Sequence, residues 1–392
     1  MAVTATAAAV RRGWTSSPAP TTGKEKERPA STGGSFRVPG KQVLEYHRRG
    51  ERKACLVPTG IIGTMTDTLT TQSIPQVELA FKPTPLQYFP RLREAWGGPH
   101  IWVKRDDLTG FGLSGNKVRK LEFHMAAAME SGCDTVITCG PYQSNHCRAT
   151  ALAGARFGLD VRLVLRTPDG KEPSVSVANL RIDTLAGAEI VYISEAQWPD
   201  RDEIMAAEEA ELAERGHKSW VIPQGGSDKL GMWGMSLGFR EFVGQIPDVI
   251  GADVAAMYHT GSSGGTTSGF GWGADRTGFE NPVVALCISE PAENLIERVD
   301  RIWKAGVETF GGDMPQPNLH YVDDYLCGGY GRVTEELVET MVEATRLTGL
   351  LFDTTYTGKS MYGVKNEIRK GRFGPDDHIV FWHTGGGFGA VN

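Results

Sequence analysis

From about Phe81 onward, short apolar runs alternate with stretches of helical periodicity, and this alternation limits the fold more than any other feature. The runs are continuously apolar, which is typical of strands buried on both faces of a parallel sheet. Helices then cover both faces, so the sequence predicts an open α/β fold, whose ligands bind beyond the carboxyl ends of the strands. The expected strands are 134–139, 161–166, 188–193, 219–223, 253–259, 283–289 and 378–384, and the expected helices are 116–131, 144–157, 173–186, 201–215, 231–244, 291–309, 333–348 and 357–370.

The first 60 or so residues have a different composition from the rest. They are rich in Ala, Thr, Ser, Pro and Gly and contain no acidic residue before Glu25. Such a composition cannot bury enough apolar surface to fold, which favours a disordered extension in a cytoplasmic protein. The alternative is an organelle transit peptide, because those peptides are rich in Arg and Ser and poor in acids.

Charge and cysteine content exclude several classes of protein. The net charge is −6, whereas nucleic-acid-binding domains are usually basic. The six cysteines form no C-x-x-C pair, so we expect reduced thiols and neither a metal site nor a disulfide framework. No apolar run reaches the roughly 20 residues that a membrane helix needs.

One lysine stands between a glycine turn and a helix start, in Ser114-Gly115-Asn116-Lys117. Most lysines are solvated surface residues, and a lysine in the first helical turn opposes the helix dipole. Three polar residues, Gln143-Ser144-Asn145, likewise follow the strand at 134–139. One of the three could simply be an N-cap.

The strand at 253–259 is followed by the most informative of several glycine-rich turns, Thr260-Gly261-Ser262-Ser263-Gly264-Gly265-Thr266-Thr267. Glycines and small hydroxyl residues let backbone N–H groups converge on a phosphate, and a helix N-terminus adds positive potential. The turn is neither a P-loop nor a dinucleotide fingerprint. A phosphate cradle together with a lysine at a turn fits pyridoxal 5'-phosphate (PLP), whose aldehyde reacts with a neutral, desolvated amine.

Seven segments in order resemble the D-cysteine desulfhydrase / 1-aminocyclopropane-1-carboxylate (ACC) deaminase family, over residues 80–390. They are "LSGNKVRKLEF", "GPYQSNHCRATA", "PQGGSDKLG", "TGSSGGTTSG", "GGYG", "TYTGKSMYG" and "HTGG". These enzymes depend on PLP and have the tryptophan-synthase-β type of fold, known as fold type II. The resemblance implies two open parallel-sheet α/β domains with the cofactor in the cleft between them, and a homodimer. It implies a large domain of residues 61–125 and 235–392, a small domain of residues 126–234, and an N-terminal extension of residues 1–60.

The resemblance also implies roles for individual residues toward the cofactor. Lys117 would be the Schiff-base lysine and the acid and base at the substrate Cα. Asn145 would donate to the phenolic oxygen, and Thr384 would meet the pyridine nitrogen with Thr357 nearby. The implied cofactor-binding residues are Asn116, Lys117, Asn145, Ser262, Ser263, Gly264, Gly265, Thr266, Thr267, Thr357 and Thr384.

Toward the substrate, a small amino acid, the resemblance implies a second group of residues. Ser144 would face the substrate carboxylate or the lysine, while Tyr330 and Tyr356 would flank the substrate. The implied catalytic residues are Lys117, Ser144, Tyr330 and Tyr356, and the implied substrate-binding residues are Gln143, Ser144, Asn145, Tyr330 and Tyr356. No metal is implied.

Thr357 bears on the choice between the two activities of the family. ACC deaminases of the family have a glutamate there, which keeps the pyridine nitrogen protonated and makes a stronger electron sink for ring opening. A threonine therefore favours β-elimination, in which sulfide leaves D-cysteine and pyruvate and ammonia are released. Some positions depart from the family pattern, among them Asp228, Met235, Thr354 and Thr355, and we expect these departures near the substrate. The alternatives are ACC deamination, a β-replacement or other lyase reaction on another amino acid, and PLP binding without turnover.

Overall fold

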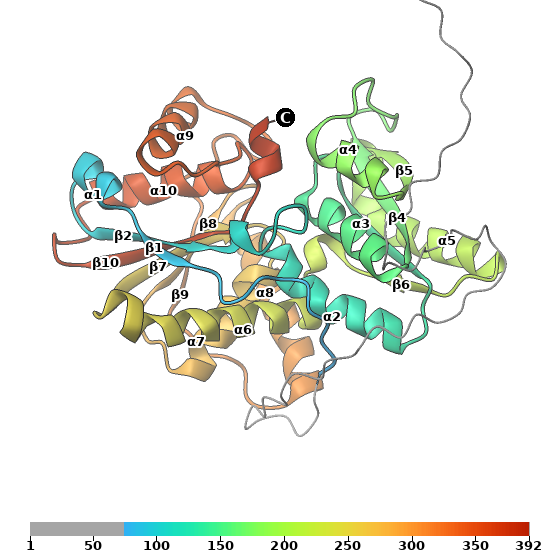
Figure 1. Cartoon of the computed structure of the whole chain (residues 1–392), viewed down its shortest axis with the longest axis horizontal. Coiled ribbons are helices and arrows are strands. Elements are labelled where there is room, and N and C mark those ends of the chain that lie inside the picture. The colour runs from blue at the N-terminus through green and yellow to red at the C-terminus, as the bar shows by residue number, and fades with distance from the viewer. Residues whose placement is uncertain (1–73, 392) are drawn as a thin grey trace, which may run out of the picture. The chain divides into compact units, whose positions relative to one another are not determined.

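The structure, a computed structural model, describes residues 74–391 and contains two separate, mainly parallel sheets (Figure 1). The larger sheet has the strand order β1-β2-β10-β7-β8-β9, and only the β1–β2 pair is antiparallel. The smaller sheet has the order β5-β4-β3-β6, with every pair parallel. The larger sheet comprises β1 (Leu86–Tyr88), β2 (His100–Arg105), β7 (Val254–Gly261), β8 (Val283–Cys287), β9 (Leu319–Val322) and β10 (His378–His383), and the smaller one β3 (Thr135–Pro141), β4 (Asp160–Thr167), β5 (Glu189–Ser194) and β6 (Ser219–Val221).

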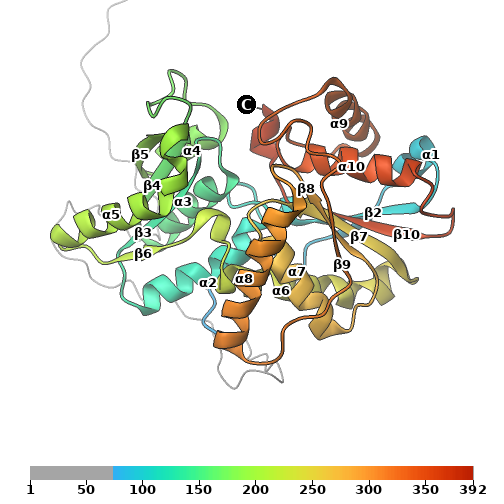
Figure 2. The ribbon, with the colours of Figure 1, turned by 180° about the vertical axis from the view of Figure 1, so that it is seen from behind.

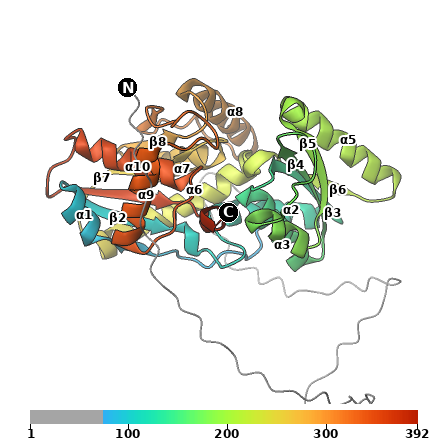
Figure 3. The same ribbon diagram turned by 90° about the horizontal axis from the view of Figure 1, so that it is seen from above.

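Helices cover both faces of each sheet, as the apolar strands require (Figures 2 and 3). Alternate residues of β10 enter two different cores: Ile379 and Phe381 pack on one side, and Val380 and Trp382 on the other. The helices are α1 (Pro90–Trp96), α2 (Lys117–Glu130), α3 (Asn145–Phe157), α4 (Ala178–Leu185), α5 (Arg201–Glu214), α6 (Lys229–Gln245), α7 (Gly265–Thr277), α8 (Ala292–Phe310), α9 (Glu335–Thr348) and α10 (Thr357–Arg369).

On the larger sheet, α1, α9 and α10 cover one face, whereas α6 and α7, with α8 beside them, cover the other. On the smaller sheet, α2, α3 and α4 cover one face and α5 covers the opposite one. The predicted α/β fold with parallel sheets is confirmed.

The strands of the smaller sheet all come from residues 126–234, and those of the larger sheet from outside this range. The division into a large and a small domain remains a prediction, and the proposed extension of residues 1–60 lies outside the described residues.

Two expectations about helices need correction, and β1, β2, β9 and α1 were not predicted from the sequence. The helix expected at 173–186 begins only at Ala178, because Pro173 and the residues after it lie in a loop and Val177 is extended. The glycine-rich turn after β7 leads directly into a full helix, α7. A helix N-terminus was expected at this turn, but no helix range was predicted there. Glycine has a low helix propensity, but here it lets neighbouring helices approach: a Cβ at Gly269 would lie 2.4 Å from the Met235 Cβ.

Two features of composition can be checked in the described part of the chain. The five cysteines that it contains are all free thiols. None of its helices combines the length and the apolar character needed to cross a bilayer.

Candidate active site

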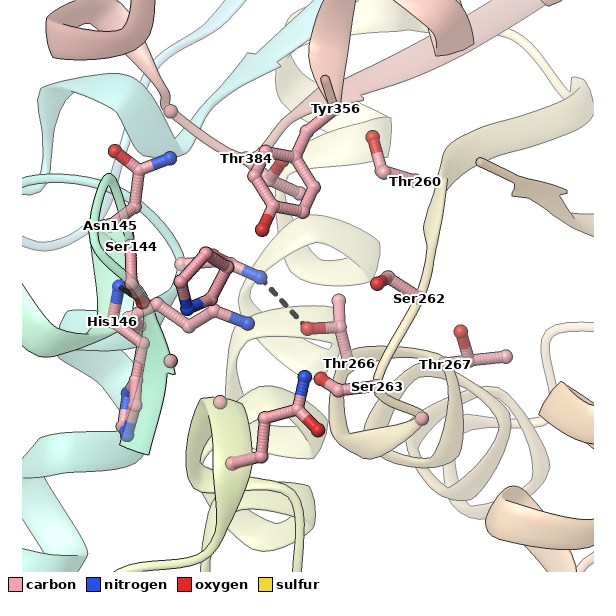
Figure 4. A pocket seen from close by; sticks show the side chains of 18 of the residues that line it. Ser144, Asn145, His146, Thr260, Ser262, Ser263, Thr266, Thr267, Tyr356 and Thr384 are labelled. Carbon is pink, nitrogen blue, oxygen red and sulfur yellow. Dashed lines mark hydrogen bonds between the residues drawn. The ribbon is translucent and has the colours of Figure 1, made fainter. Parts of the chain in front are cut away.

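A cavity lies where the carboxyl ends of β3, β7 and β10 meet the N-termini of α2, α3 and α7 (Figure 4). It holds about 730 Å³ of empty space, its open mouth included. Its walls carry the Lys117 amine together with amides, hydroxyls, an imidazole and a thiol, and no described carboxylate lines it. The lining residues are Asn116, Lys117, Cys139, Gly140, Pro141, Ser144, Asn145, His146, Gln224, Gly225, Thr260, Ser262, Ser263, Gly264, Thr266, Thr267, Tyr356, Thr384 and Gly385.

Lys117 is the first residue of α2, and the turn before it is held tightly against the end of β10. Gly115 has a φ of +92°, and a Cβ on it would lie 2.7 Å from the Thr384 carbonyl oxygen. The Asn116 N–H donates to the same oxygen at 3.0 Å. Only glycine fits this approach, which brings Lys117 into the cavity. Burial lowers the pKa of Lys117 to about 8, so an appreciable minority of the amine is neutral at physiological pH.

A second lysine, Lys120, lies one turn further along the same face of α2. Its Nζ donates to the Gly225 carbonyl oxygen at 3.0 Å, and burial lowers its pKa well below the ordinary lysine value. A Cβ on Gly265 would lie 2.8 Å from the Lys120 Nζ, so this amine borders the start of α7. Sequence reasoning missed Lys120, although its i+3 spacing from Lys117 was a usable signal.

The N-terminus of α7 forms a concave site that suits an anion. Gly264, with a φ of +97°, precedes the helix, and the Ser263 hydroxyl pairs with that of Ser227 at 2.7 Å. Thr266 accepts from the Asn116 amide at 2.8 Å, the dashed line of Figure 4. The buried Thr267 hydroxyl has no partner among the described residues. Free backbone N–H groups, an unpaired hydroxyl and a neighbouring lysine together fit a phosphate group.

At the start of α3, three consecutive polar residues have distinct surroundings. Ser144 caps the helix, and its Oγ accepts from the His146 and Cys147 N–H groups, each at 3.2 Å. The Oδ1 of Asn145 accepts from Asn179 at 3.2 Å, which leaves the Asn145 amide nitrogen for the cavity. His146 pairs through Nε2 with Thr138 at 2.9 Å. Burial holds its pKa well below the ordinary value, so the imidazole is neutral.

Two tyrosines close another side of the cavity. Tyr356 lines it directly, and its hydroxyl lies 2.9 Å from that of Tyr330, which is behind it. Burial raises the pKa of Tyr330 to about 12 and raises that of Tyr356 well above its ordinary value, so both phenols keep their protons.

Asp353 organises the turn that carries Tyr356. Its carboxylate accepts from the backbone N–H groups of Thr355, Tyr356 and Thr357, and from the Thr357 hydroxyl at 2.8 Å. Asp353 was not singled out from the sequence, because a single aspartate before a helix is usually only a cap.

The structure therefore brings most of the residues named from the sequence to one cavity. Four of them do not line it. Gln143 bonds to the backbone at Val177 and Asn179, Gly265 begins α7 outside the lining, Tyr330 lies behind Tyr356, and Thr357 bonds to Asp353. The departure at Met235 is also not near the substrate side, because Met235 packs in the core between α6 and α7.

Comparison with known proteins agrees with this geometry. Residues 77–385 match a family described as pyridoxal-phosphate dependent enzyme. A Thermotoga maritima protein, provisionally named 1-aminocyclopropane-1-carboxylate deaminase, is 37% identical over 80% of this chain and 97% of its own. The D-cysteine desulfhydrase of Salmonella typhi is 34% identical, over 80% of this chain and 94% of that protein.

An Arabidopsis thaliana relative carries both names. It is a mitochondrial bifunctional D-cysteine desulfhydrase / 1-aminocyclopropane-1-carboxylate deaminase, and it is 36% identical over 80% of this chain and 79% of its own. Among solved structures, an ACC deaminase homologue superposes with a TM-score of 0.70 at 32% identity, covering 81% of this chain and 93% of the homologue. This chain belongs to the family of pyridoxal-phosphate-dependent enzymes.

Proposed function

We propose that this protein catalyses β-elimination from a small D-amino acid, and that D-cysteine is converted to pyruvate, hydrogen sulfide and ammonia. Lys117, a desolvated amine in a cavity whose lining is rich in amides and hydroxyls, supports a PLP site. The observation that carries the choice of reaction is the absence of any described carboxylate from the cavity lining.

The residues of the cavity fit the cofactor. The N-terminus of α7 (Ser262 to Thr267) would hold the phosphate, and Lys120 would balance its charge. The Asn145 amide nitrogen would donate to the phenolic oxygen. Lys117 would bond to the aldehyde carbon, since its lowered pKa supplies the neutral amine that this reaction needs.

The ring nitrogen would lie against Thr384, the hydroxyl at the end of β10. The Thr357 hydroxyl already donates to Asp353, so we assign Thr357 to the turn that supports Tyr356. A hydroxyl does not keep a pyridine nitrogen protonated, whereas a carboxylate does. This arrangement favours a substrate with a good leaving group at Cβ, such as sulfide, over the opening of a cyclopropane ring.

When bound, the cofactor withdraws electrons from the substrate Cα and so makes its proton removable. Lys117 is the base nearest to that position and would take the proton. Ser144, whose oxygen already accepts two N–H groups, is left with its hydroxyl proton to donate to the substrate carboxylate. The two neutral tyrosines would flank the substrate, with Tyr356 in contact and Tyr330 behind it.

An absorbance and product assay tests the proposal. The purified protein with added PLP is expected to show the visible band of a lysine-bound cofactor, and Lys117→Ala is expected to lack it. Lys218→Ala, which removes an exposed lysine of the smaller-sheet region, should keep the band. D-cysteine should yield sulfide and pyruvate, while L-cysteine, D-serine and ACC should yield less product. If the wild type shows the band but D-cysteine gives no product, the reaction assigned here is wrong.

ACC deamination is the second candidate, because the Thermotoga maritima and Arabidopsis thaliana relatives carry that name. The formation of 2-oxobutanoate from ACC at a higher rate than pyruvate from D-cysteine would establish it. A visible band without product from any amino acid would instead indicate a protein that only binds PLP.

We also propose a homodimer of chains that each divide into large (61–125 and 235–392) and small (126–234) domains. The cytoplasm is the proposed compartment, and the alternative is an organelle reached through a transit peptide in residues 1–60. Sedimentation would give the oligomeric state, and fluorescent fusions with and without residues 1–60 would give the compartment.

A further inference from the structure

Arg148 is a fully buried guanidinium in the first turn of α3, three residues after Asn145. Its Nε donates to the Asn179 Oδ1 at 2.8 Å. Its other nitrogens donate to the carbonyl oxygens of Gly112 and Ser114, in the loop just before Lys117. No described carboxylate accepts a hydrogen bond from it. Its guanidinium instead donates to amide and carbonyl oxygens that flank the cavity.

An arginine can only donate hydrogen bonds, and this fixes the orientation of the next side chain. The Asn179 oxygen must face Arg148, so its amide nitrogen faces the other way. That nitrogen donates to the Gln143 carbonyl oxygen at 2.9 Å and to the Asn145 Oδ1 at 3.2 Å. Asn145 consequently turns its own amide nitrogen, the remaining donor, to the cavity wall seen in Figure 4.

We propose that Arg148 and Asn179 are positioning residues that make Asn145 present a hydrogen-bond donor, and not an acceptor, to the cofactor. The inference rests on the cofactor-binding part of the proposed function and does not depend on which amino acid reacts. Arg148 also fixes the position of the first turn of α3, which carries Asn145, relative to the loop before Lys117. One guanidinium bonds both to Asn179 and to the Ser114 carbonyl oxygen.

The proposal makes a spectroscopic prediction. A donated hydrogen bond stabilises a negatively charged phenolic oxygen, and so favours the form of the lysine-bound cofactor that has lost its proton. Loss of the donor should raise the pH at which the visible band titrates. A shift of about one pH unit is expected for one hydrogen bond to a charged group.

Asn179→Asp is the sharpest variant, because it keeps the shape and still accepts from Arg148 but cannot donate to Asn145. The Asn145 amide nitrogen would turn toward the new carboxylate. The titration midpoint should rise by about one pH unit, as above, and PLP affinity should fall about tenfold. Asn366→Asp is the matched control, since the Asn366 side chain donates to the Tyr362 carbonyl oxygen within α10, and its variant should titrate like the wild type.

Two further variants keep the test decisive if Asn179→Asp folds poorly. Asn179→Ala removes the amide without adding charge and should also raise the midpoint. Arg148→Lys keeps the charge but cannot reach both Asn179 and Ser114, so it should lower kcat about 10- to 100-fold through misalignment of Lys117 with Asn145.

The outcomes separate this inference from the proposed function. An unchanged midpoint in Asn179→Asp and Asn179→Ala, with normal thermal stability, overturns the inference and leaves the proposed function standing. A raised midpoint in a protein that turns over some other amino acid supports the inference, and only the substrate assignment fails. A wild type that takes up no PLP overturns both.

Discussion

Lys117 differs from an ordinary surface lysine because burial, and not a neighbouring positive charge, dominates its acidity. Its pKa is lowered to about 8, while Lys120 forms a hydrogen bond that acts in the opposite direction. The spacing of the two lysines was visible in the sequence, but their partners were not. Gly225 and Gly265 come from segments more than 100 residues away, so only folding shows that Lys120 borders the same cavity.

The acidity of Lys117 predicts how cofactor uptake depends on pH. Only the neutral amine attacks an aldehyde, so the rate of PLP uptake by cofactor-free protein should rise with pH and reach half its maximum near pH 8. Stopped-flow absorbance at a series of pH values would measure this midpoint. Pyridoxine 5'-phosphate has no aldehyde, and its binding should lack the midpoint. A midpoint near 10.5, the ordinary lysine value, would contradict the proposed burial effect.

Among the elements, the continuously apolar strands were predictable because their composition alone reveals burial on both faces. β10 was expected at 378–384 and spans His378–His383. The strands β1, β2 and β9 and the helix α1 were missed. β1 and β9 have three or four residues, which carry too little periodicity to be recognised, and β2 reads HIWVKR, which is not a continuously apolar run. The extent of α7 was not predicted for another reason. Its glycines allow close packing against a neighbouring helix, and this packing overrides their low helix propensity.

Gly265, the first residue of α7, allows a test of the proposed phosphate site. Gly265→Ala places a Cβ 2.7 Å from the Ser227 Cα and 2.8 Å from the Lys120 Nζ, inside the proposed phosphate site. PLP affinity should fall about 10- to 100-fold, the range for lost hydrogen bonds to a charged group. Fluorescence titration with PLP would measure the change.

Gly244→Ala is the matched control for that variant. Gly244 lies in α6 with nothing within 4 Å of an added Cβ. Affinity should stay unchanged there, and the free energy of unfolding should increase by up to about 1 kcal/mol through helix propensity. Equal loss of affinity in both variants would argue against a phosphate at α7.

For the molecule as a whole, a buried ionic network joins β2 and its following turn to α2 and α6. Glu241 accepts from Lys104 and Arg119, and Arg119 also pairs with Asp106 at 2.8 Å. Lys104 and Arg119 lie 137 and 122 residues from Glu241 along the chain and meet it only in the folded protein, so sequence patterns could not connect them. The order of the strands was beyond prediction for the same reason: it is set by pairing between distant segments.

The network predicts a loss of stability in acid. Burial alone would raise the pKa of Glu241, but Arg119 and Lys104 lower it to about 2. Its stabilising effect is therefore complete above about pH 4.5 and is lost as the pH falls toward 2. Glu241→Gln should lower the free energy of unfolding at pH 7 by about 3 kcal/mol, because the buried Lys104 loses its ionic partner and Arg119 loses one of its two.

Urea unfolding at pH values from 7 to 3 would test this expectation. The wild type should lose stability across the lower part of that range more steeply than Glu241→Gln. Glu214→Gln, at an exposed position at the end of α5, should match the wild type throughout. A Glu241→Gln variant as stable as the wild type at pH 7 would show that the network contributes little.

The last strand of the chain lies in the middle of the larger sheet, between β2 and β7. During synthesis, β2 and β7 are complete long before β10 leaves the ribosome, yet neither can gain this neighbour until then. Thr384 and the close approach of Gly385 to Gly115 follow directly after β10. A cavity lined by Thr384 and Gly385 is therefore incomplete until β10 has inserted between β2 and β7, so PLP binding would report that this strand has reached its place.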